Sequence, residues 1–219
     1  MDEARFVERL AEGCRALGVT VGPDVPPRLW RLMGELLKWN AKVNLTAITA
    51  PEEVVEKHFL DSLAVLPEVE GAGSVLDVGA GAGFPGLPLK LARPALAVTL
   101  VDAVGKKVGY LKATIASPGL GLTGSKAVHT RAEGRPDAEG LPLADRVLAR
   151  AFMDLPDWLA LAPAYLAPGG HVVAMLGKAL GEDALRAEGE KRGLGLVSAR
   201  AYRLPFSGAE RQVVAYTRR

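Results

Sequence analysis

The chain has 219 residues and a formal net charge of +2, with 49% hydrophobic and 24% charged residues. This composition is typical of one globular domain with a sizeable core plus a short extra segment, and it excludes wholesale disorder. Aromatic residues make up only 5% of the chain, which argues against a surface of stacked rings for single-stranded nucleic acid. The single cysteine, Cys14, excludes an internal disulfide and a cysteine-based metal cluster.

The first residues lack the basic and then apolar pattern of a signal peptide. The longest apolar stretch, 159–177, is interrupted by prolines and glycines, so it does not read as a membrane span. We therefore expect a cytoplasmic protein without a membrane segment. The three histidines, His58, His129 and His171, are scattered without metal-ligand spacing, so we expect no metal site.

Residues 1–66 predict helices only. Apolar residues recur at helical spacing in two stretches, 6–17 and 29–37, which glycine and proline residues separate. A third helix is expected to begin at Pro51, with two acidic residues in its first turn, where the helix dipole favours negative charge. We expect this segment to form a helical cap packed on a larger domain of residues 67–219.

From Ser74 onward, short β-branched runs alternate with helix-like stretches, a pattern that predicts crossover units and a mostly parallel sheet. The last two runs are joined by residues 204–211, which lack a helical pattern, so we expect an antiparallel hairpin at the sheet edge. An α/β, Rossmann-like fold with a seven-stranded sheet and an antiparallel edge strand follows. The predicted strands cover residues 75–78, 97–102, 127–130, 146–149, 171–175, 196–201 and 212–217.

A glycine-rich segment, Asp77 to Gly86, follows the first predicted strand directly. Glycines let the backbone turn sharply and approach a ligand closely, at the strand end where open sheets bind ligands. Read from Gly81, the segment fits the G-x-G-x-x-G pattern, and Asp102 lies at about the distance of a ribose-binding acid. This match alone is weak, because a nicotinamide dinucleotide and other adenosine-containing ligands share it.

The charge of Asp77 separates these ligands. A carboxylate just before the glycine turn would repel a pyrophosphate, whereas it would attract the ammonium and sulfonium groups of S-adenosylmethionine. The segment also has no lysine for a nucleoside triphosphate, and Asp102 can accept hydrogen bonds from ribose hydroxyls with either ligand. We therefore favour S-adenosylmethionine over a nicotinamide cofactor, with a merely connecting glycine turn as the simplest alternative.

Motifs along nearly the whole chain occur in one order that is similar to the RsmG (GidB) family, bacterial guanine-N7 methyltransferases of 16S ribosomal RNA. Because the order is kept over the whole length, the resemblance is more specific than the glycine loop alone. The motifs are Trp39-Asn40, Asn44-Leu45-Thr46, His58-Phe59-Leu60-Asp61-Ser62, Leu76 to Gly86, Leu100-Val101-Asp102, Lys106-Lys107, Arg131-Ala132-Glu133, Ala149-Arg150-Ala151-Phe152 and Glu210-Arg211.

The resemblance implies that Gly79 and Phe84 line the cofactor pocket and that Ala132 and Glu133 meet the adenine, largely through backbone groups. It places Arg150, the candidate catalytic residue, between the methyl end of the cofactor and the RNA. The implied S-adenosylmethionine-dependent methyltransferase fold agrees with the predicted sheet. The complete predicted cofactor site is Asp77, Gly79, Gly81, Gly83, Phe84, Asp102, Ala132, Glu133 and Arg150.

One position departs from the family, which usually carries Lys-Gly at the end of the fifth strand. Leu176-Gly177 stands there in this chain. The predicted chemistry needs no general base, because guanine N7 carries a free lone pair, and no catalytic dyad is visible in the sequence. The chain also lacks an Asn-Pro-Pro-Tyr type motif, which exocyclic-amine methyltransferases carry.

The expected partner is 16S ribosomal RNA or the small subunit, and the expected state is a monomer. A small-molecule methyltransferase and a non-catalytic cofactor-binding sensor remain alternatives. Five basic residues are candidate phosphate contacts, although a solvated basic face is the simpler interpretation for all except Arg150. They are Lys106, Lys107, Arg150, Arg203 and Arg211.

Overall fold

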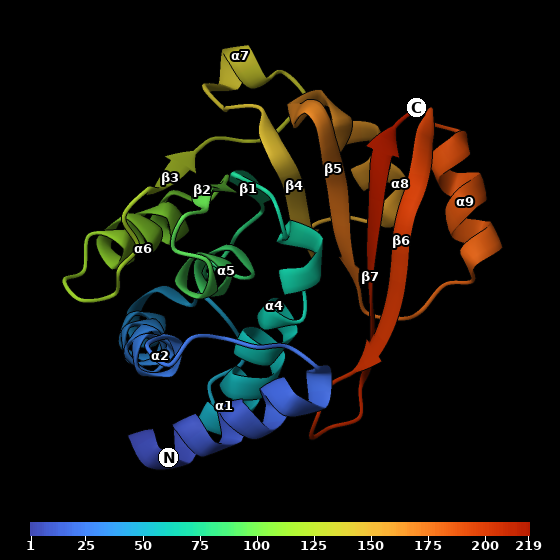
Figure 1. The fold of residues 1–219 in the computed structure, drawn as a ribbon. Coiled ribbons are helices and arrows are strands. Elements are labelled where there is room, and N and C mark those ends of the chain that lie inside the picture. Colours follow the sequence, from blue (N-terminus) through green and yellow to red (C-terminus); the bar gives the residue numbers. More distant parts are fainter.

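A seven-stranded sheet lies at the centre of the computed structural model, which describes residues 1–219 (Figure 1). The strand order is β3-β2-β1-β4-β5-β7-β6, and neighbouring strands from β3 to β5 are parallel. All seven predicted strands are present, most of them with longer ends. Their bounds are β1 Ser74–Val78, β2 Ala97–Asp102, β3 Ser125–His129, β4 Ala144–Arg150, β5 Leu166–Leu176, β6 Leu194–Arg203 and β7 Glu210–Arg218.

The last two strands form the predicted antiparallel hairpin at one edge of the sheet. Within it, β7 is antiparallel to both of its neighbours and lies between β5 and β6. The edge strand is therefore β6. The strand that runs opposite to all the others is β7, which lies next to the edge and not at it. The Rossmann-like prediction is confirmed with this refinement.

Helices cover both faces of the sheet, and α1, α2 and the following short helices lie together beside α5 (Figure 1). No helix is long and apolar enough to cross a membrane. The helical bounds are α1 Glu3–Leu17, α2 Val25–Val43, α3 Pro51–Val54, η1 Val55–Leu60, α4 Asp61–Leu63, η2 Leu66–Val69, α5 Gly86–Ala92, α6 Gly105–Ile115, α7 Pro136–Glu139, α8 Leu155–Leu161, η3 Ala162–Tyr165 and α9 Glu182–Glu190.

Each face of the sheet has its own hydrophobic core. On one face, α1, α2, η1, α5 and α6 pack on inward side chains such as Val98 and Leu100 of β2. On the other face, Trp158 of α8 and Leu185 of α9 belong to a second cluster. The N-terminal helices thus share a core with the sheet, and the domain boundary between residues 66 and 67 stays a prediction.

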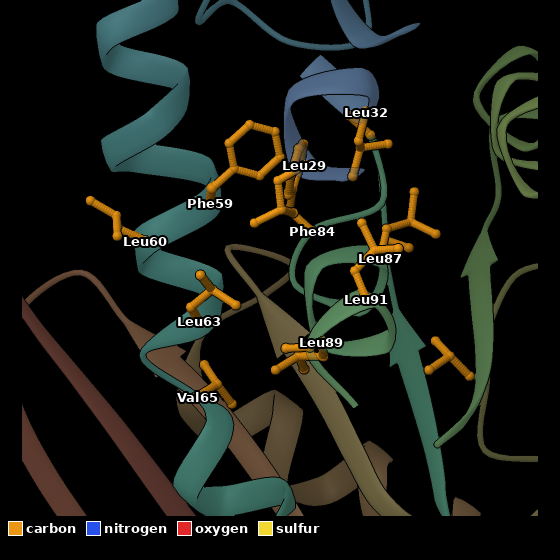
Figure 2. Close-up of a cluster of buried hydrophobic side chains, with 14 of the residues drawn as sticks. Leu29, Leu32, Phe59, Leu60, Leu63, Val65, Phe84, Leu87, Leu89 and Leu91 are labelled. Carbon is orange, nitrogen blue, oxygen red and sulfur yellow. The ribbon is translucent and has the colours of Figure 1, made fainter. Parts of the chain in front are cut away.

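Close packing between the N-terminal helices and α5 explains how the cap is held. Figure 2 shows apolar side chains from α2, η1 and α5 pointing into one cluster. The Phe59 ring lies 5.8 Å from the ring of Phe6 and 5.6 Å from that of Phe84, measured between centroids. Phe59 therefore connects α1 directly with the glycine loop after β1.

The third helix begins at Pro51 as predicted, but it does not continue as a regular α-helix. Residues Val55–Leu60 form a π-helical segment, and nearly every side chain from Val54 to Leu66 is buried. The wider turn lets one short segment face the hairpin and the sheet together. The buried Glu56 carboxylate accepts hydrogen bonds from the N–H groups of Phe206 and Ser207, at 2.7 and 2.6 Å, in the turn between β6 and β7.

We predict that Phe59→Ala lowers the free energy of unfolding by about 3–5 kcal/mol, the usual cost of removing a buried phenylalanine ring. Because cap and sheet share a core, the variant should still unfold in one transition. Urea denaturation followed by circular dichroism and by tryptophan fluorescence measures the free energy of unfolding and the number of transitions. Leu143→Ala, at a half-exposed side chain, is the control and should change little. Two separate transitions would contradict a shared core.

Candidate functional site

Two cavities lie beside the glycine loop, at the carboxyl ends of β1, β2, β4 and β5. They have volumes of about 470 and 460 Å³ and meet at Gly79 and Ala151, which line both. The first, which we call the cap cavity, is bounded by residues of the N-terminal helices and their loops together with Gly81, Phe84 and Arg150. The second, the strand cavity, is bounded by Asp102, Val104, Lys107, Ala132 and Phe152, among others.

The glycine loop needs glycine at all three predicted glycine positions for its backbone shape, and the φ angle of Gly83 is +89°. Gly79 and Gly81 have φ angles of +73° and +56°, in the left-handed region that side chains disfavour. The N–H groups of Gly79 and Ala80 both donate to the carbonyl of Val101, at 2.9 Å, which ties the loop to β2. A Cβ on Gly79 would also lie 2.3 Å from the Phe152 ring, so only glycine fits there.

Asp77 does not line either cavity, so the structure does not favour its predicted contact with the cofactor, which stays a prediction. Along β1 its side chain points to the same face as Val75, toward α5, and it is fully buried beneath the loop. One carboxylate oxygen accepts the N–H of Gly86 at 2.8 Å, and the other has no partner. Burial raises the pKa of Asp77 to about 7, against the lowering effects of the Gly86 hydrogen bond and Arg150.

The bond between Asp77 and Gly86 still bears on ligand choice. Gly86 is the first residue of α5, and the N–H groups at such a helix start are the donors that dinucleotide folds offer to pyrophosphate. Here the carboxyl group of Asp77 occupies the N–H of Gly86. A Cβ on Gly86 would lie 2.8 Å from the same carboxylate oxygen, so the site has room for glycine alone. The helix end is therefore closed to a phosphate.

Asp102 lies where the sequence predicts it, at the end of β2 and in the wall of the strand cavity. Its two carboxylate oxygens accept the N–H groups of Gly81 at 2.9 Å and Val104 at 2.8 Å. These bonds fix the carboxylate between the glycine loop and the start of α6. Each oxygen keeps a free lone pair, which fits a pair of ribose hydroxyls.

Ala132 lines the strand cavity, and its buried N–H has no acceptor in the protein, as expected for a group that meets a base edge. The contact of Glu133 with the adenine, which the resemblance implies, stays a prediction that the structure does not favour. Its N–H donates to the Glu139 carboxylate at 2.9 Å, and its own carboxylate pairs with Arg135 outside both cavities. Gly83 also lies outside, because it packs against Leu87 and the neighbouring α6.

Phe84 lines the cap cavity through a stacked pair of rings rather than alone. The His58 imidazole lies parallel to the Phe84 ring, with centroids 4.4 Å apart. Burial, and then the charge of Arg150, lower the pKa of His58 to about 3, so the imidazole is neutral at physiological pH. His58 thus lies at the interface between the cap and the sheet.

Arg150 ends β4 and points to the cap, on the same face as Leu148. Its Nη1 donates to the carbonyl of Lys57 at 2.8 Å and pairs with Asp61 Oδ2 at 3.3 Å, and its Nη2 lies 3.1 Å from Nδ1 of His58. Since guanidinium nitrogens only donate, Nδ1 of His58 accepts. Its Nε2 then carries the proton and donates to the hydroxyl of Thr46 at 3.0 Å.

Asp61 joins three side chains beneath the cap cavity. In addition to Arg150, it accepts a hydrogen bond of 2.7 Å from Tyr202 on β6 and lies 3.7 Å from the Arg211 guanidinium. The carboxylate is buried, and the neighbouring charge raises the pKa of Tyr202 further than burial alone. Local sequence patterns do not show this role of Asp61, because its partners lie about 90 to 150 positions away along the chain.

Several residues of the cap cavity were missed or only partly assigned from the sequence. Lys57 contributes its carbonyl, while its ammonium group pairs with Glu53. Arg211, a predicted phosphate contact, lines this cavity beside Asp61, whereas Arg203 pairs with Glu210 at the exposed hairpin end. No periodicity signals these roles. The only available signal is that these residues fall inside or beside the motifs that the resemblance singles out.

Leu176, the departure from the family pattern, lies at the end of β5 and lines the cap cavity. The wall is therefore apolar where the family usually carries a lysine. Arg150 and Arg211 line the same cavity, so cationic side chains remain within it.

A family model described as rRNA small subunit methyltransferase G matches residues 27–214 of the chain. The chain belongs to this family. It is 71% identical over 218 residues to the ribosomal RNA small subunit methyltransferase G of Myxococcus xanthus, with 100% of each chain covered. It is 41% identical over 207 residues to the protein of the same name from Geobacter sulfurreducens, with 94% of each chain covered. The predicted resemblance is confirmed.

The methyltransferase fold is shared with solved structures of low sequence identity. The glycopeptide N-methyltransferase MtfA complexed with sinefungin has a TM-score of 0.59 at 12% identity, covering 73% of this chain and 85% of its own. A SAM-dependent methyltransferase from Aquifex aeolicus has a TM-score of 0.55 at 20% identity, covering 75% and 92%. These likenesses confirm the predicted fold class. The family membership also does not favour the sensor and small-molecule alternatives.

We predict a pH-dependent cost of the buried Asp77 carboxyl. Its native pKa of about 7 exceeds the unfolded value, so between pH 4 and 7 the unfolded chain has lost the proton that the native state keeps. Stability should therefore fall as the pH rises, by about 1.4 kcal/mol for each pKa unit of difference. Asp77→Asn removes this slope. Urea denaturation of both proteins at pH 4 to 8 measures it, and equal slopes would contradict the assignment.

We predict that Asp102→Ala weakens S-adenosylmethionine binding by about 10- to 100-fold, because the ribose loses its acceptor and two loop N–H groups lose theirs. Isothermal titration calorimetry measures the affinity. Glu133→Ala is the matched control, since that carboxylate lies outside the strand cavity, and its affinity should stay within about 2-fold. If Glu133→Ala lowered the affinity for S-adenosylmethionine and Asp102→Ala did not, Glu133 and not Asp102 would be the cofactor-binding residue.

Proposed function

We propose that this chain transfers a methyl group from S-adenosylmethionine to N7 of a guanine in 16S ribosomal RNA of the small subunit. We further propose that it acts as a monomer in the cytoplasm. The names of its relatives state a small-subunit ribosomal RNA methyltransferase. The acceptor atom is inferred from the chemistry of the cap cavity.

The observation that carries the acceptor assignment is the lack of an available general base beside the glycine loop. Both nitrogens of His58 are engaged, one by Arg150 and one by Thr46, and its low pKa makes it a poor proton acceptor. The oxygens of Asp61 are held by cations and by the Tyr202 hydroxyl. Such a site suits an acceptor that has no proton to lose, and guanine N7 is one.

The residues of the strand cavity fit the proposed cofactor. Asp102 would accept from the ribose hydroxyls, the N–H of Ala132 would meet the adenine, and the apolar side chains of Val104 and Phe152 would cover the ring. When bound, S-adenosylmethionine supplies an electrophilic methyl group to a lone pair. The carboxyl group of Asp77, which already accepts the N–H of Gly86 at the start of α5, disfavours a nicotinamide dinucleotide.

The remaining contribution of the chain is positioning. Arg150 and the stacked rings of Phe84 and His58 line the cap cavity next to Gly79, which borders both cavities. A base held there would lie beside the glycine loop, with its acceptor atom toward the strand cavity. Orientation of this kind, with water excluded, can supply several kcal/mol toward the barrier.

The proposal predicts new 7-methylguanosine when small subunits lacking the modification are incubated with this protein and S-adenosylmethionine. Nucleoside mass spectrometry of the 16S ribosomal RNA measures it, with naked RNA in a parallel reaction. Arg150→Ala should lower the rate by about 100-fold while leaving the fold intact, as loss of a positioned donor commonly does. Arg186→Ala, on the exposed face of α9, is the matched arginine control.

A different methylated nucleoside would show that the acceptor is wrong. No modified nucleoside at all, with cofactor binding intact by calorimetry, would instead favour the sensor. Turnover of a small molecule without RNA would favour the small-molecule methyltransferase.

A further inference from the structure

The guanidinium group of Arg150 is only partly used by the protein. Of its five N–H groups, three face the carbonyl of Lys57, the carboxylate of Asp61 and Nδ1 of His58. The Nε–H and the second Nη2 hydrogen have no acceptor in the protein. Because the side chain is 19% exposed and lines the cap cavity, these two donors are available only to a group that enters it.

The three protein contacts hold the guanidinium in one orientation. They come from successive residues of the π-helical segment and from Asp61 directly after it, so the cap and β4 fix the group from two sides. His58 can accept only while it is neutral, which its burial ensures. A guanidinium held in this way loses little side-chain entropy when it binds.

We propose that Arg150 is a specificity-determining residue that donates to O6 of the target guanine. This inference rests on the proposed function and names the group that Arg150 recognises. In guanine, O6 is an acceptor on the same edge as N7, whereas adenine carries an amine donor at this position. A group that only donates therefore accepts guanine and rejects adenine.

The contact must go to O6 and not to N7. A hydrogen bond to N7 would occupy the lone pair that attacks the methyl group, so an arginine that bridged both atoms would inhibit the reaction. Donation to O6 leaves N7 free and fixes the plane of the base beside the glycine loop. It also leaves no buried donor unpaired when the RNA closes the cavity.

A backbone phosphate is the other acceptor that an arginine commonly binds, and the charges argue against it here. Asp61 lies 3.3 Å from Nη1 of Arg150 and is only 6% exposed, so the positive charge of the guanidinium is already balanced. A phosphate brought to the same group would approach a buried carboxylate. A neutral carbonyl oxygen needs only the free hydrogen-bond donors.

The test uses small subunits reconstituted with one altered nucleotide at the position where 7-methylguanosine forms. Inosine keeps O6 and N7 but lacks the 2-amino group, whereas 2-aminopurine keeps N7 and the 2-amino group but lacks O6. Transfer of tritiated methyl groups is measured with the wild type and with Arg150→Met, which keeps much of the apolar stem. Unfolding temperatures of both proteins verify the fold, and Arg150→Leu, which also lacks a hydrogen-bond donor, replaces the methionine variant if that variant is destabilised.

We expect the wild type to methylate inosine within about 10-fold of guanosine and 2-aminopurine at least about 100-fold more slowly. In Arg150→Met, guanosine and inosine should slow by about 100-fold, and the guanosine preference over 2-aminopurine should shrink toward the intrinsic difference in N7 reactivity. The ratio of the two rates is compared between the wild type and the variant, so any difference in intrinsic N7 reactivity between guanine and 2-aminopurine cancels.

An unchanged preference in the variant, with all three nucleotides slowed equally, would overturn the proposal and indicate a phosphate contact. Equal wild-type rates on guanosine and 2-aminopurine would overturn it as well. Failure of the wild type to methylate the guanosine subunits is a different result, because it overturns the proposed function itself.

Discussion

The contact between Arg150 and the π-helical segment is the interaction on which the site depends. It joins the end of β4 to the cap through the Lys57 carbonyl, His58 and Asp61. A guanidinium buried at this depth is tolerated only when it is paired and hydrogen-bonded. The cap therefore does more than cover the sheet, since it orients the Arg150 guanidinium beside the glycine loop.

A second buried ionisable group, Asp77, acts beneath the loop. Its carboxyl group takes the first N–H of α5 and closes the helix end that a dinucleotide fold would offer to phosphate. The same glycine pattern can thus serve different ligands, because the residue beneath the loop decides whether an anionic ligand can bind there. Asp102, held by Gly81 and Val104, keeps its outer lone pairs for neutral hydroxyls.

The chemistry of the cap cavity follows from the hydrogen bonds that its polar side chains make within the protein. His58, Asp61 and Thr46 form one hydrogen-bonded network with Arg150, so none of them is free to remove a proton. The guanidinium of Arg150 still has free donors for an incoming group. A site of this kind recognises and positions an acceptor whose nucleophilic lone pair is already present, which is the basis of the proposed guanine specificity.

The sequence alone determined the strands, the glycine loop and the places of Asp102 and Arg150, because alternation, turn glycines and strand ends are local features. Tertiary structure decided the rest. Asp77 turned under the loop and the N–H of Glu133 was taken by Glu139, while the π turn aligned His58 with Arg150. Local patterns cannot show such outcomes, because each depends on which partner a polar group meets once distant segments pack together.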